Sequence, residues 1–97
     1  MATQNKYEIY ERMTREEFKK QFLIEYPVFL QKLFLKCPGI TPDEMDVCAC
    51  ILKGLPVHVI HEILGIPERT IETHKRTVTK KLGLDHSQRL GSFLKTL

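Results

Sequence analysis

The sequence predicts an all-α fold, with a four-helix unit over residues 40–97 that is preceded by one kinked helix or two short helices in residues 1–39. Apolar side chains recur every three or four residues, which is the spacing of a helix, and no stretch alternates convincingly between apolar and polar residues as a strand does. Glycines and prolines separate these periodic stretches at short intervals, which is typical of short helices joined by tight turns. The 97 residues suit one compact domain with a modest core.

In the N-terminal part, residues 1–13 are polar and are expected to be partly frayed, and a helix is predicted to follow them. Thr14 can accept a hydrogen bond from the amide of Glu17, whose carboxylate reaches back to the amide of Thr14, so the two residues form a capping box. Pro27 then kinks this helix or starts a second one, because proline lacks an amide proton and disfavours a helical conformation in the preceding residue. Four aromatic side chains of this segment follow helical spacing and either pack into the core or form a surface for dimerisation or for a partner: Phe18, Phe22, Phe29 and Phe34.

Four helices are predicted in residues 40–97. The first follows a second capping box, formed by Thr41 and Glu44, with Pro42 at the favoured first helical position, and it runs to about Lys53 before Gly54. Its later part is apolar almost all round, so other helices are expected to surround it. The remaining three are a short helix near Val57–Leu64, a helix from about Glu68 to Leu82 that stops at Gly83, and a last helix capped by Asp85 or Ser87.

The composition is that of an ordinary globular protein. Charged residues make up 28% and hydrophobic residues 42%, and no apolar run is long enough to cross a membrane. The N-terminal residues lack the apolar stretch of a secretory signal, so we expect a cytoplasmic protein. Cys37, Cys48 and Cys50 are expected to be buried thiols, because an odd count in a chain that is not exported does not suit a disulfide framework. No enzymatic activity, cofactor or metal site is expected, since the sequence has no Gly-rich phosphate loop, paired-carboxylate pocket or recognisable nucleophile motif.

The predicted helix from Glu68 to Leu82 has one apolar face and one polar face. At about 100° per residue, Ile71 and Val78 fall on one side and polar or basic side chains fall on the other. A short helix and a turn containing glycine precede it, and this helix-turn-helix arrangement lets the second helix enter the major groove of DNA. The net charge of +3 is too small to indicate nucleic-acid binding by itself. The polar side carries Arg69, Glu72, Thr73, Arg76 and Lys80, which can reach base edges or phosphates.

Several motifs in residues 40–97 resemble the LuxR-type (GerE-like) DNA-binding domain. They are Ile40-Thr41-Pro42-Asp43-Glu44, Glu62-Ile63-Leu64-Gly65-Ile66, Arg69-Thr70-Ile71-Glu72-Thr73-His74 and Lys80-Lys81-Leu82-Gly83-Leu84, with their spacing intact. The resemblance implies a four-helix domain whose third helix reads DNA and whose fourth helix commonly supports dimerisation. Residue by residue, it implies base-facing positions for Glu72, Thr73 and Arg76, and phosphate-contacting positions for Arg69, Thr70, Lys75 and Lys80.

Three features depart from the pattern of that family, and one of them is the pair His58 and His61 on the outer side of the second helix. Pro56 and Pro67 stand where a serine or threonine often caps the second and third helices, and each lost cap costs about 1 kcal/mol. Residues 1–39 are too few for the receiver or ligand-binding domain that usually controls such proteins, so control by phosphorylation or by a small molecule is not expected.

The sequence therefore predicts a bacterial transcription regulator that binds double-stranded DNA as a homodimer. Two other interpretations stay open. One is a protein-interaction module that acts on another regulator or on RNA polymerase without reading DNA. The other is a helix-turn-helix similar to region four of sigma factors, which would need a promoter-melting domain that is not evident in this sequence.

Overall fold

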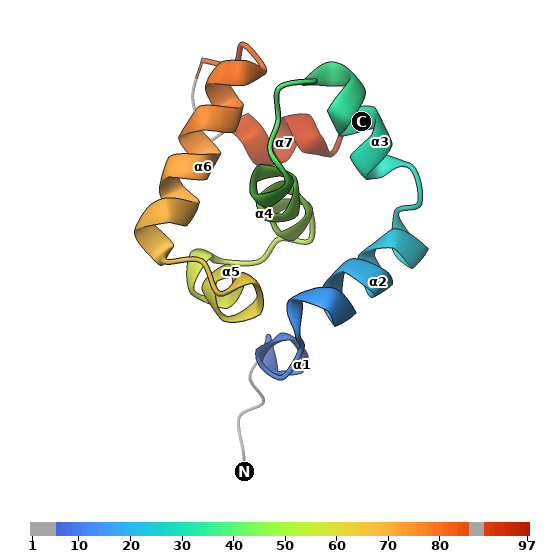
Figure 1. The fold of residues 1–97 in the computed structure, drawn as a ribbon, viewed down its shortest axis with the longest axis vertical. Helices are drawn as coiled ribbons and strands as arrows, with labels where there is room; N and C mark the ends of the chain where they lie inside the picture. The colour runs from blue at the N-terminus through green and yellow to red at the C-terminus, as the bar shows by residue number, and fades with distance from the viewer. Residues whose placement is uncertain (1–5, 86–88) are drawn as a thin grey trace.

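The computed structural model describes residues 6–85 and 89–97, and this part of the chain contains seven helices and no strand (Figure 1). The predicted all-α fold is therefore confirmed. Three helices precede residue 40 and four follow it. The helices are α1 (Glu8–Glu11), α2 (Arg15–Glu25), α3 (Phe29–Lys36), α4 (Pro42–Leu52), α5 (Val57–Leu64), α6 (Glu68–Lys81) and α7 (Leu90–Leu94).

The N-terminal segment folds into three short helices instead of one or two. Helix α1 forms in a stretch that was expected to be partly frayed, and it packs against α5, where the rings of Tyr7 and His58 meet edge to face with centroids 6.5 Å apart. Helix α2 begins at the predicted capping box, since the Thr14 hydroxyl accepts from the amide of Glu17 and the Glu17 carboxylate accepts from the amide of Thr14. Pro27 lies between α2 and α3, so this part forms two helices and not one kinked helix.

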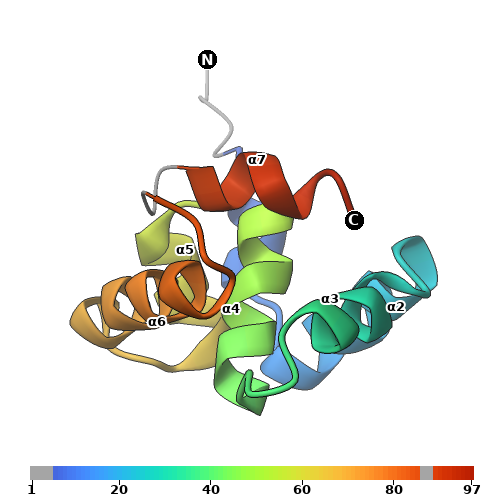
Figure 2. The same ribbon diagram turned by 90° about the horizontal axis from the view of Figure 1, so that it is seen from above.

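Helix α4 lies at the centre of the molecule, with α6 on one side and α2 and α3 on the opposite side (Figures 1 and 2). It packs against α3, α5, α6 and α7. Its side chains from Val47 to Cys50 are almost completely buried, as the apolar stretch predicts. Burial raises the pKa of the Cys48 and Cys50 thiols to about 12, so both stay protonated at neutral pH. Cys37 is also a buried free thiol, which confirms the predicted state of all three cysteines.

Three of the four aromatic residues proposed as a partner surface lie inside the molecule. Phe18, Phe22 and Phe29 keep only 2%, 2% and 5% of their surface exposed, and the rings of Phe22 and Phe29 meet edge to face at 5.6 Å. They share one apolar core with residues of α4 to α7, because α2 and α3 lay their aromatic faces on the four-helix unit. Phe34 differs, since 48% of its surface is exposed. In the folded monomer, Phe34 is therefore the one residue of these four that is open to a partner.

The helix ends agree with the glycine positions in most places. Gly65, which follows α5, has a φ of 69°, a left-handed conformation that glycine adopts without strain. Helix α7 is described from Leu90, with Arg89 before it, and residues 86–88 lie outside the described part of the chain. Of the two predicted caps, Ser87 lies outside the described residues and Asp85 directly precedes that stretch, so the cap of the last helix stays a prediction.

Candidate nucleic-acid interface

Helices α5 and α6 pack through their apolar faces and form the predicted helix-turn-helix. The turn between them spans residues 65–67. His61 on α5 braces this turn, because its Nδ1 lies 2.8 Å from the carbonyl oxygen of Ile66. A carbonyl oxygen only accepts, so Nδ1 carries the proton and donates. Pro56 and Pro67 occupy the N-cap positions of the two helices without a side-chain cap, as the sequence predicts.

The outer face of α6 presents the residues predicted to contact DNA. Thr73, Arg76 and Lys80 line one hollow beside the C-terminal half of the helix, so the fold brings these three together. The hydroxyl of Thr73 donates to the carbonyl oxygen of Arg69 at 3.1 Å, which leaves the Thr73 oxygen available as an acceptor. Arg69, Glu72, Thr73, Arg76 and Lys80 are exposed, and Thr70 and Lys75 are half-buried.

The cations on this face differ in whether they already have an acidic partner. Lys75 Nζ lies 3.7 Å from Glu72 Oε1, a partly exposed pair one helical turn apart that contributes no more than about 0.5 kcal/mol. That pair is weak enough to exchange for contacts with a nucleic acid. Among the described residues, Arg76 and Lys80 form no ion pair with any carboxylate. Both side chains are therefore open to an anionic ligand.

Lys81 belongs to the same basic run but fixes the end of α6 to the rest of the molecule. Its Nζ lies 2.8 Å from Glu44 Oε1 and 2.8 Å from the carbonyl oxygen of Gly39. The same carboxylate oxygen of Glu44 accepts from the amide of Thr41 and so completes the capping box of α4. Burial alone would raise the pKa of Glu44, but the hydrogen bonds from Lys81 and from the Thr41 amide outweigh it and hold that pKa below its ordinary value.

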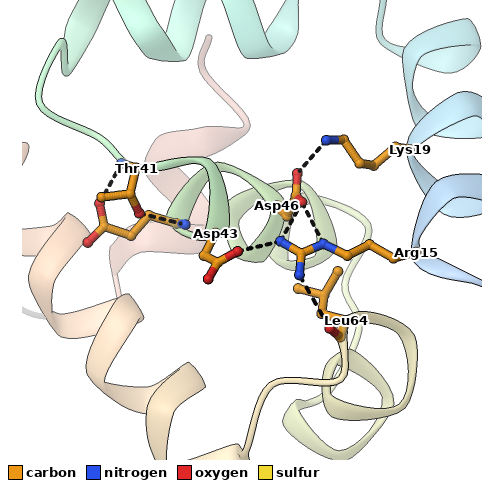
Figure 3. A network of polar contacts seen from close by, with 7 residues as sticks. Arg15, Lys19, Thr41, Asp43, Asp46 and Leu64 are labelled. Atoms are coloured by element: carbon orange, nitrogen blue, oxygen red, sulfur yellow. Dashed lines mark hydrogen bonds and ion pairs between the residues drawn. The ribbon is translucent and has the colours of Figure 1, made fainter.

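Arg15 on α2 braces the helix-turn-helix from outside it (Figure 3). Its Nη2 lies 2.6 Å from Asp43 Oδ1, its Nε lies 2.9 Å from Asp46 Oδ2, and its Nη1 lies 3.3 Å from the carbonyl oxygen of Leu64. Leu64 is the last residue of α5, where helix carbonyls lack partners within the helix. Asp46 is buried, and its other oxygen lies 3.8 Å from Lys19 Nζ. Helix α2 therefore ties the start of α4 to the end of α5.

Sequence reasoning missed the role of Arg15. Its partners lie 28 to 49 residues away, so the contacts leave no local pattern in the sequence. One indirect sign was available in Asp46, which directly precedes the apolar stretch of α4 that is expected to be surrounded by other helices, because a buried carboxylate needs a cationic partner. Lys81 could not be separated from the other basic residues of α6 without knowing that α4 and residue 39 lie beside it.

Two other kinds of feature are absent from residues 6–85 and 89–97. No group of three or more His, Cys, Asp or Glu side chains in these ranges is placed to hold a metal ion. None of the helices in them combines the length and the apolar character needed to cross a bilayer.

Comparison with known proteins agrees with this geometry. Residues 39–93, more than half of the chain, match the GerE model, which describes bacterial regulatory proteins of the luxR family. The chain belongs to the LuxR family. A stretch of 45 residues is 42% identical to the transcriptional regulatory protein MctR of Rhizobium johnstonii, and it covers 46% of this chain. The match covers 21% of MctR, so the chain spans about a fifth of the length of that relative. No solved structure matched the chain.

The LuxR-family match contains the whole helix-turn-helix and all seven predicted DNA-contacting residues. Helices α1, α2 and α3 precede the matched segment, and Arg15 is one of their residues. The brace between α2 and the helix-turn-helix is therefore formed by a part of this chain that the family pattern does not describe.

Proposed function

We propose that this LuxR-family chain is a cytoplasmic transcription regulator that binds specific sequences in double-stranded DNA as a homodimer, with α6 in the major groove. The observation that carries the proposal is the outer face of α6, which is polar and exposed and holds Arg76 and Lys80 without ion pairs among the described residues. An α-helix fits the major groove, and α4 and α5 pack behind α6 so that this face points away from the molecule (Figure 2).

In this proposal the base-facing side chains are Glu72, Thr73 and Arg76. The guanidinium of Arg76 can donate to both O6 and N7 of a guanine, and the carboxylate of Glu72 can accept from the amino group of a cytosine. Contacts to phosphates fix the position of the helix along the groove without reading the sequence. The phosphate contacts are assigned to Arg69, Thr70, Lys75 and Lys80.

The homodimer is proposed because one reading helix contacts only a few bases. Helix α6 has 14 residues and is about 21 Å long, so its few base-facing side chains read only a short half-site. Two copies that bind one helical turn of DNA apart, about 34 Å, double the number of bases that are read. Helix α7 lies near the C-terminal end of α4, on a face beside α6 and not opposite to it (Figure 2). We assign the contact between the two copies to the surface around α7, because pairing there lets both α6 helices face the same DNA.

Salt-dependent DNA affinity tests the proposal. Lys80→Ala is expected to weaken binding to all sequences alike and to reduce the slope of log affinity against log salt by about 1 for each bound copy, and so by about 2 for the homodimer, because each copy loses one phosphate contact. Arg76→Ala is expected to cost roughly 1–3 kcal/mol at preferred sites and to relax base preference. Lys36→Ala is a matched control, since it removes the same charge as Lys80→Ala from α3 on the far side of α4.

The opposite result would favour the other candidate function. If the wild-type chain bound DNA weakly and with no dependence on sequence, the helix-turn-helix would serve as a protein-interaction module. Its partner would then be another regulator or RNA polymerase.

A further inference from the structure

Large apolar side chains are exposed mainly on one segment of the chain. Among the described residues seven such side chains are exposed, and six of them lie between residues 23 and 35, while residues 40–97 as described contribute none. Single exposed apolar residues are ordinary, but their concentration in so short a segment favours an interaction surface there. The six are Leu23, Ile24, Tyr26, Val28, Phe34 and Leu35.

Helix α3 contributes the part of this surface where exposed apolar side chains lie beside two lysines. At about 100° per residue, Leu35 lies at the middle of its exposed side, with Phe34 on one edge and two lysines on the other. Leu35 is 71% exposed, although its side chain is apolar and large. We call Lys32, Phe34, Leu35 and Lys36 the α3 outer face. A shallow groove runs beside it, lined by Lys32, Leu35, Lys36, Thr96 and Leu97.

The charge of the α3 outer face favours an acidic partner. Lys32 and Lys36 form no ion pair among the described residues, and no acidic residue occurs in the sequence between Glu25 and Asp43. Two copies of this face brought together would oppose four uncompensated ammonium groups, so the face does not suit self-association. The two lysines lie one helical turn apart, about 6 Å along the axis, which matches carboxylates four residues apart on a partner helix.

The position of the α3 outer face separates it from DNA binding. Helices α3 and α6 lie on opposite sides of α4 in both views (Figures 1 and 2). A duplex bound at α6 therefore leaves the α3 outer face open. At physiological salt the Debye length is about 8 Å, so the attraction between the phosphates of that duplex and Lys32 and Lys36 is largely screened. A two-fold pairing through this face would also point the two α6 helices away from each other.

We propose that the α3 outer face binds an acidic amphipathic helix of another protein. The apolar stripe of that helix covers Leu35 and Phe34, and its carboxylates pair with Lys32 and Lys36. This is recognition of a helix by a surface groove, in which apolar anchors supply affinity and flanking charges supply selectivity. The binding does not depend on α6 reading DNA, so it stands or falls separately from the proposed function.

A synthetic peptide tests the proposal on the intact chain. The peptide is helical, with leucines every three or four residues and glutamates four residues apart, and it is titrated into isotope-labelled protein and followed by NMR. Chemical-shift changes are expected to centre on α3 and residues 96 and 97. A matched peptide with glutamine in place of glutamate is expected to bind about tenfold more weakly, because two ion pairs are lost. Leu35→Glu is expected to abolish binding, and a double Lys32→Glu, Lys36→Glu variant is expected to lose the preference for the acidic peptide.

The basic face of α6 supplies the main control. Arg76→Ala is expected to leave peptide affinity unchanged, and a DNA duplex bound at physiological salt is expected not to displace the peptide. Shift changes centred on α6, displacement by DNA, or equal affinity for the two peptides would overturn the proposal. If the wild-type chain formed a dimer and Leu35→Glu dissociated it, the α3 outer face would be a contact with a second copy. If the chain bound anionic lipid vesicles but not the peptide, the face would bind a membrane surface. Each of these two outcomes also overturns it.

Discussion

Arg15→Met removes the guanidinium that joins α2 to α4 and α5, while it keeps an unbranched apolar stem. Asp46 dominates the expected cost, because its side chain is only 5% exposed and loses a partner at 2.8 Å. Unpairing a fully buried carboxylate costs about 3–5 kcal/mol, whereas an exposed pair contributes about 0–1 kcal/mol. Arg15 is itself 33% exposed, and Lys19 remains 3.8 Å from Asp46, so we place this part at about 2–3 kcal/mol.

The other two contacts of Arg15 add less. Asp43 is 52% exposed and is readily hydrated once its partner has gone. The carbonyl oxygen of Leu64 loses a long hydrogen bond of 3.3 Å, which contributes about 0.5–1 kcal/mol. The expected loss is therefore about 3 kcal/mol in the free energy of unfolding, from a total of about 5–15 kcal/mol for a small domain. At about 4–8 °C per kcal/mol, the melting temperature is expected to fall by about 12–24 °C.

Urea unfolding followed by circular dichroism measures this loss. Arg15→Lys is expected to retain part of the stability, because an ammonium group keeps the charge but cannot reach three acceptors at once. Lys20→Met on the same helix is the matched control and is expected to change stability by less than about 0.5 kcal/mol, since Lys20 is exposed and has no ion pair among the described residues. Amide exchange at residues 64–66 is expected to rise in Arg15→Met, because the end of α5 is no longer held.

A double-mutant cycle tests whether the unpaired carboxylate of Asp46 causes the loss of stability in Arg15→Met. Arg15→Met and Asp46→Asn together are expected to cost less than the sum of the two single changes, because the neutral side chain no longer needs a cation. The reasoning would be refuted by additive effects, or by a loss below about 0.5 kcal/mol in Arg15→Met alone.

Two further predictions concern buried groups. The folded pKa of Glu44 is lowered, so its stabilisation is present above the unfolded value of about 4.3 and is lost as pH falls through the folded value. Glu44→Gln is therefore expected to flatten the dependence of stability on pH below about pH 5, and an acid limb identical to that of the wild type would contradict this. Cys48 and Cys50, with pKa values of about 12, are expected to react with a thiol reagent at about pH 8 only after unfolding in urea, and rapid labelling of the native chain would be the contrary result.

Features that depend on neighbouring residues could be predicted from the sequence. Both capping boxes fixed the starts of α2 and α4, because each is completed by Thr14 and Glu17 or by Thr41 and Glu44 within one helical turn. The polar outer face of α6 could also be predicted, because helical periodicity depends only on residues that are close in sequence. Helix α1 could not be predicted, since its four residues have no side-chain cap and pack against α5, more than 45 residues away in sequence.

Features that depend on long-range packing could not be predicted. Periodicity placed the aromatic residues of α2 and α3 on one face of each helix. It does not say whether that face packs on the same chain or on a second one. The structure places Phe22 and Phe29 in the core and leaves Phe34 at the surface. The bonds of Arg15 and Lys81 to acidic residues on opposite sides of α4 likewise require the fold, because no local rule pairs residues so far apart.

The most direct test of DNA reading by α6 is a selection of bound fragments from a random duplex library, carried out with the wild-type chain and with Arg76→Ala. A homodimer that reads bases through α6 predicts enrichment of one motif with two-fold symmetry, and loss or blurring of that motif in Arg76→Ala. Absence of any enriched motif, with only weak binding that disappears as salt rises, would contradict sequence-specific recognition by this helix.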